Sequence, residues 1–149
     1  MKLAKESFIE IIKAIDLRDW EIAKGFLADQ ITMDYASFTK EAPHTVTSEE
    51  LIDSWKALLP GFDHTQHQLS NFLCYEEVDL AHIQCYVSAL HFIADQPDPL
   101  WTVIGTYDIK MYRDIHFKWR ITSWVFNYKF QSGNLKLKEI ALENVKLKM

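Results

Sequence analysis

Residues 80–94 read LAHIQCYVSALHFIA, and this stretch decides the fold. Mostly apolar side chains occupy every second position, at Ala81, Ile83, Cys85, Val87, Ala89, His91 and Ile93. The positions between them carry His82, Gln84, Tyr86 and Ser88. Because successive side chains of a strand point to opposite faces, this alternation predicts a long strand with one buried face.

Three further segments with strand character lie near it, at residues 66–75, 100–112 and 117–130. Residues 95–99 contain two prolines and predict a turn, and Gly133 ends the last alternating segment. Alternating strands in succession are typical of an antiparallel sheet with one face on the core. The Lys-rich tail after Gly133 predicts a short helix.

Before residue 61 the apolar positions mostly follow the period of a helix. Residues 3–15 predict a first helix, and Asp19 is the expected N-cap of a second, whose apolar face runs over 22–27. A third helix should open at the capping box formed by Thr47 and Glu50.

Pro60-Gly61 should end this third helix. Between the second and third helices, residues 31–38 alternate as a strand and residues 40–46 read as a loop. Helices followed by long antiparallel strands predict an α+β fold in which a curved mixed or antiparallel sheet wraps around helices and a central cavity. Residues 1–149 should form one domain.

Composition narrows the possible partners. Nine Phe, six Tyr and five Trp are enough to fill a core and to line a ligand cavity. The net charge of −5 argues against nucleic acid as a partner. Charged residues interrupt the N-terminal segment, so no signal peptide is apparent, and no run approaches a membrane span. We therefore expect a cytoplasmic protein that binds a small molecule and neither nucleic acid nor membrane.

Histidines are the first candidates for chemistry. His91 lies on the apolar face of its strand, where a histidine is more often a hydrogen-bonded core residue than a functional one. His64 and His67 form an H-x-x-H pattern, but on a strand they point to opposite faces, so we expect no metal site. Cys74 and Cys85 show no metal or redox spacing and are expected to be buried thiols.

Four short stretches, in this order, carry a resemblance: Asp16-Leu-Arg-Asp-Trp20, Asp34-Tyr35-Ala-Ser-Phe38, Thr65-Gln-His67 and Val87-Ser-Ala-Leu-His91. Together they resemble the scytalone dehydratase family, a SnoaL-like branch of the superfamily named for nuclear transport factor 2. The similarity runs from about residue 14 to residue 130. It implies a cone-shaped fold and a cofactor-free active site.

The resemblance also implies roles for individual residues. Asp16 would hydrogen-bond the imidazole of His91, and His67 would stand across the cavity. Tyr35 would hold a water or the substrate carbonyl, and Phe38 would line the pocket. A buried carboxylate can fix the tautomer of a histidine, and histidine titrates near neutral pH, so such a centre suits acid–base chemistry.

Two positions depart from the pattern of the family. Ile15 stands where the family has a tyrosine that helps to hold the active-site water, and it cannot donate a hydrogen bond. Alignment places Asp108 where the family has an asparagine that grips a substrate hydroxyl. Both residues are expected to contact substrate, and both make scytalone itself a poor candidate.

The functional prediction is a cofactor-free dehydratase, isomerase or cyclase for a small cyclic, polyketide-like or aromatic compound. A non-catalytic binding domain, or a structural subunit of a larger complex, is the alternative, because one fold hosts many functions. The residue pattern does not separate dehydration from cyclisation or isomerisation. By resemblance we expect a homo-oligomer, a dimer or a trimer.

Overall fold

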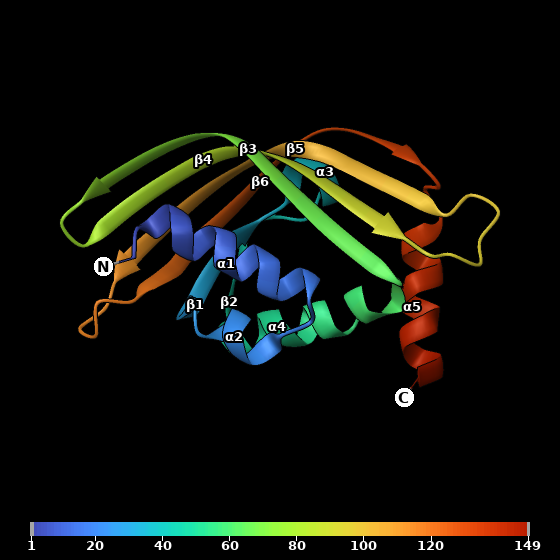
Figure 1. Cartoon of the computed structure of the whole chain (residues 1–149), viewed down its shortest axis with the longest axis horizontal. Helices are drawn as coiled ribbons and strands as arrows, with labels where there is room; N and C mark the ends of the chain where they lie inside the picture. Colours follow the sequence, from blue (N-terminus) through green and yellow to red (C-terminus); the bar gives the residue numbers. More distant parts are fainter. Residues whose placement is uncertain (1, 149) are drawn as a thin grey trace.

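The computed structural model describes residues 2–148 and shows a curved, six-stranded sheet with helices beneath its concave face (Figure 1). The strands are β1 (Leu27–Asp34), β2 (His44–Thr47), β3 (His64–Glu77), β4 (Leu80–Phe92), β5 (Leu100–Arg113) and β6 (Trp119–Gly133). The helices are α1 (Ala4–Asp16), α2 (Trp20–Lys24), α3 (Ala36–Thr39), α4 (Ser48–Lys56), the 3-10 turn η1 (Leu59–Gly61) and α5 (Leu137–Lys148). The predicted α+β fold with a curved mixed sheet is confirmed.

The four long strands pair with one another antiparallel, in the order β6-β5-β4-β3. Compared with the predicted bounds, β3 is longer at both ends, β5 and β6 extend further at their C-terminal ends, β4 ends two residues earlier and β6 begins two residues later. In the pair of β4 and β5, Leu80 lies opposite Tyr112 and Phe92 opposite Leu100, with no break in register. Register shifts interrupt the neighbouring pairs, β3 with β4 and β5 with β6, and the concave face of these strands covers the helices (Figure 1).

The other two strands attach the N-terminal half to this sheet. Strand β1 pairs parallel with β6 and antiparallel with β2, so the sheet order continues as β2-β1-β6. The predicted helix caps are present: Asp19 accepts a hydrogen bond from the backbone N–H of Ile22, and Thr47 and Glu50 form the capping box.

The predicted strand over 31–38 is wrong at both ends. Strand β1 starts at Leu27, within the expected second helix, and stops at Asp34. The Asp34 carboxylate accepts a hydrogen bond from the N–H of Ala36 at 3.0 Å, which turns the chain into α3 instead of extending the strand. The predicted loop over 40–46 contains the start of β2, which pairs with β1.

Helix α1 packs its apolar side on the concave face of the sheet. The Phe8 ring meets Tyr107 of β5 edge-on at 5.9 Å and Trp124 of β6 at 5.5 Å between centroids. Phe8 and Ile11 are fully buried. Within residues 2–148, no helix combines the length and the apolar character needed to cross a lipid bilayer.

Candidate active site

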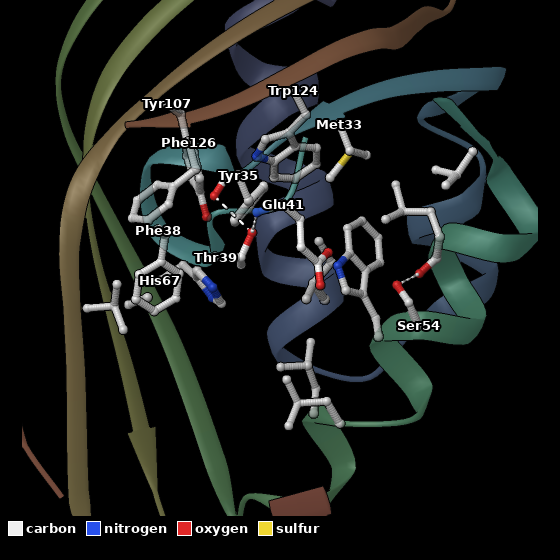
Figure 2. A pocket seen from close by; sticks show the side chains of 18 of the residues that line it. Met33, Tyr35, Phe38, Thr39, Glu41, Ser54, His67, Tyr107, Trp124 and Phe126 are labelled. Carbon is white, nitrogen blue, oxygen red and sulfur yellow. Dashed lines mark hydrogen bonds between the residues drawn. The ribbon is translucent and has the colours of Figure 1, made fainter. Parts of the chain in front are cut away.

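A cavity of about 360 Å³ lies between the concave face of the sheet and the helices α1 and α4 (Figure 2). Aromatic and aliphatic side chains form most of its wall. Ile15 at the end of α1 and Phe38 in α3 are both part of this wall, as the sequence predicted. His67 and His91 face the same cavity from the neighbouring strands β3 and β4.

Asp16, the last residue of α1, anchors the polar part of the site. Its Oδ1 lies 2.7 Å from Nδ1 of His67 and accepts a hydrogen bond from Oγ1 of Thr65 at 3.0 Å. Its Oδ2 accepts the backbone N–H of His67 at 2.8 Å. Burial raises the pKa of Asp16, but the hydrogen bonds and charge of His67 outweigh it and lower the pKa overall. The carboxylate is therefore ionised at neutral pH.

A second layer holds this carboxylate in place. Arg18, in the left-handed region at φ 60°, donates to Oγ1 of Thr65 at 2.7 Å and to the carbonyl of Leu59 at 2.7 Å. Because the guanidinium occupies the acceptor side of the Thr65 hydroxyl, the hydroxyl proton is directed to Asp16. The sequence did not assign these supporting roles to Arg18 and Thr65.

His67 is placed to act as a base. Since its Nδ1 faces a carboxylate, the neutral ring carries its proton on Nδ1, which leaves a lone pair on Nε2. A carboxylate in this position orients the ring and stabilises the imidazolium that forms when Nε2 takes a proton. His67 in the cavity wall and its partner Asp16, which does not itself line the cavity, thus form an acid–base dyad.

The predicted pairing of Asp16 with His91 is wrong. Nδ1 of His91 lies 3.0 Å from the carbonyl oxygen of Trp101 on the adjacent strand β5, and the two rings stack at 4.3 Å. The end of α1 lies beside β3, so its carboxylate reaches His67, whose ring centroid is 6.3 Å from that of His91. Burial lowers the pKa of His91 to about 4, so this ring is neutral at neutral pH.

The predicted substrate contact of Asp108 is also wrong. Asp108 lies on the convex face of the sheet, where it pairs with Nε2 of His82. Its neighbour Tyr107 is buried and faces the cavity. Neighbouring residues of a strand point to opposite faces, so with Tyr107 turned inward the side chain of Asp108 points outward.

Tyr35 and Tyr107 place two phenols in the cavity wall. Burial raises the pKa of Tyr35 to about 12, although its interaction with the Tyr107 hydroxyl opposes that rise. Burial likewise raises the pKa of Tyr107 well above its usual value. Both hydroxyls therefore keep their protons at neutral pH and can donate hydrogen bonds.

The described histidines do not form a metal site with other side chains. His64 lies at the start of β3 and stacks on Phe92, on the side of the sheet away from His67. Among residues 2–148, no three His, Cys, Asp or Glu side chains are grouped as metal ligands. The cysteines differ from each other, since Cys85 is buried as expected but Cys74 is exposed.

Solved structures of other proteins share this fold. A protein from Kribbella flavida is 25% identical over 91% of this chain and 94% of its own, with a TM-score of 0.82. A protein from Novosphingobium aromaticivorans, provisionally named a scytalone dehydratase, is 14% identical over 86% of this chain and 83% of its own, with a TM-score of 0.68.

A hexachlorocyclohexane dehydrochlorinase is 10% identical over 87% of this chain and 85% of its own, with a TM-score of 0.67. No functionally curated protein is significantly similar to the chain in sequence. The model of the SnoaL-like domain matches residues 10–125, which include Asp16, His67 and His91 and cover most of the chain. The chain therefore belongs to the family of SnoaL-like domains.

Proposed function

We propose that this protein is a cofactor-free lyase or isomerase that acts on a small cyclic, polyketide-like or aromatic compound by acid–base chemistry. The observation that carries the proposal is that His67, which lines a mostly apolar cavity, has its Nδ1 at 2.7 Å from Oδ1 of Asp16. An ionised carboxylate costs free energy when it is partly buried, and a scaffold has no need of it. A catalytic base does need such a partner.

In the proposed reaction, Nε2 of His67 takes a proton from the carbon next to a substrate carbonyl. Asp16 stabilises the imidazolium that results. The imidazolium then returns the proton to a departing hydroxyl, which leaves as water, or to another carbon, which shifts the double bond. Dehydration and isomerisation therefore differ only in where the proton goes.

His91 takes a different role from the one that the resemblance implies. Its Nδ1–H is directed to the Trp101 carbonyl, so Nε2 carries a lone pair. A neutral imidazole of this kind accepts a hydrogen bond from a substrate hydroxyl but does not protonate a leaving group readily. We therefore assign the proton transfer to His67 and a binding role to His91.

The structural neighbours give the proposal its reaction class. Two of them are named for the removal of water or of hydrogen chloride from a small molecule. In both reactions one carbon loses a proton and the neighbouring carbon loses a leaving group. The wall of this cavity is compatible with the same class of compound, since most of its side chains are apolar or aromatic.

The test is a screen of cyclic β-hydroxyketones for loss of water, followed by ultraviolet absorbance of the conjugated product. We expect His67→Ala to lower turnover by about 10²–10⁴-fold, the usual contribution of a general base. His64→Ala is the matched control, because it removes a histidine from the same strand on the opposite face.

Equal turnover by wild type and a folded His67→Ala variant, on a substrate that the screen identifies, would refute the dyad. Tight binding of ring compounds with no turnover of any of them would favour the alternative, a non-catalytic binding domain.

A further inference from the structure

Trp124 on β6 presents an unused hydrogen-bond donor. The residue is 2% exposed, yet its indole Nε1 has no acceptor among the residues that the structure describes. Buried polar groups nearly always have partners, because leaving one unpaired is costly. An unpaired donor in a cavity wall therefore indicates a ligand atom that accepts from it.

Other buried indoles of the same sheet are paired. Nε1 of Trp101 donates to Oε1 of Gln131 at 2.8 Å, and Nε1 of Trp119 donates to the carbonyl of Lys2 at 3.2 Å. Trp101 and Trp124 both line the cavity, so burial in this wall does not by itself prevent pairing. The N–H of Trp124 is therefore unpaired because no acceptor lies at its particular place in the wall, and not because the wall as a whole lacks acceptors.

Neighbouring rings hold the Trp124 indole in one orientation. Phe8 and Tyr107 each lie 5.5 Å from it between centroids, and Trp55 lies at 5.8 Å. Figure 2 shows the nitrogen-bearing edge of Trp124 turned toward Tyr35 and Tyr107. An interaction of hydrogen-bond type with Trp124 lowers the pKa of Tyr35 against the larger effect of burial, but the indole N–H does not meet the geometry of a hydrogen bond, so it keeps room for another acceptor.

We propose that Nε1 of Trp124 is a further donor to the carbonyl oxygen of the substrate, beside the hydroxyl of Tyr107 and that of Tyr35, which the resemblance already assigns to this oxygen. This inference rests on the proposed function and adds a further residue to its substrate site. The indole can only donate, so it requires an acceptor atom. Most of the cavity wall is apolar or aromatic, which disfavours a charged carboxylate and leaves an uncharged oxygen as the better fit.

Donors at this position also suit the chemistry at His67. Loss of a proton next to the carbonyl moves negative charge onto its oxygen, and preorganised donors stabilise that charge most in a site that excludes water. The indole N–H and the two phenols cannot lose their protons at neutral pH, so they stay donors throughout the reaction.

The test compares 1-indanone with indane, two ring compounds that differ by the carbonyl oxygen. We expect 1-indanone, but not indane, to move the proton resonance of the Trp124 indole downfield in a ¹H–¹⁵N spectrum. The resonance is identified by its loss in Trp124→Phe. In that variant the preference for 1-indanone over indane should fall by about 3- to 10-fold, the value of one hydrogen bond.

Trp101→Phe is the matched control. It removes an indole from the same wall, but the N–H of that indole already donates to Gln131. It should keep the preference for the ketone, and so should His67→Ala. The proposal is overturned if both tryptophan variants lose the preference equally, if the Trp124 resonance in wild type does not respond to the ketone, or if no ketone binds. Loss of turnover in His67→Ala is measured separately, so the dyad and the oxygen site can fail independently.

Discussion

Replacing His91 by glutamine should make the protein less sensitive to acid. His91 is 7% exposed, and burial lowers the pKa of its ring to about 4, while His67 and Arg18 nearby also disfavour its charged form. In the unfolded chain the pKa is about 6.5. Between these two values the unfolded state binds more protons than the folded state, so stability rises with pH and is lost as the pH falls.

The size of the effect follows from the two pKa values. Going from about pH 7 to about pH 4.5, His91 should lower the free energy of unfolding by about 2 to 3 kcal/mol. Asp16 does not add to this loss, since its lowered pKa places its contribution at more acid pH. Glutamine keeps an N–H donor for the Trp101 carbonyl but does not titrate. The variant should therefore not lose this part of its free energy of unfolding when the pH falls.

Urea unfolding at the two pH values, followed by tryptophan fluorescence, measures the difference. His64→Gln is the control, because His64 is exposed and should leave the acid sensitivity of wild type unchanged. The reasoning is refuted if His91→Gln loses as much stability on acidification as wild type does.

Three further predictions concern other parts of the chain. Asp16→Asn should lower kcat by about 10²–10⁴-fold with an unchanged circular dichroism spectrum, and full activity would contradict the dyad. Gly61→Ala should destabilise by about 1–3 kcal/mol, because a Cβ there would lie 1.9 Å from the carbonyl oxygen of Ala141; an unchanged Tm would show that α5 moves freely. Thr47→Ala should cost about 0.5–2 kcal/mol in chemical unfolding through loss of the capping box, and no loss would mean that α4 is held by packing alone.

Local signals in the sequence predicted much of the fold. The helix caps at Asp19 and Thr47 depend on hydrogen bonds to residues three positions away. The long strands depend on the alternation of apolar and polar side chains along the chain. The inward position of Tyr107 could also be predicted from the sequence, because Val103, Tyr107 and Ile109 occupy alternate positions of one strand and share one buried face. Asp108 falls between the buried residues Tyr107 and Ile109, so the same alternation places its side chain on the opposite face.

The pairing within the site could not be predicted in the same way. His67 and His91 both point inward from adjacent strands, so alternation treats them alike. Which of them meets Asp16 depends on where α1 ends relative to the sheet. That placement is set by the packing of the whole helix, together with the contact of Arg18 to Thr65.

The parallel pair of β1 and β6 bears on how the chain folds during synthesis. Strand β1 is complete once residue 34 has been made, but its partner β6 does not begin until residue 119. Until then, the growing chain exposes the edge of β1 that β6 will occupy, and β5 also lacks its second neighbour. Contacts this distant in sequence make folding slow, and open strand edges invite pairing with other chains. The ribosome-bound intermediate is thus the state in which we expect this protein to depend most on chaperones.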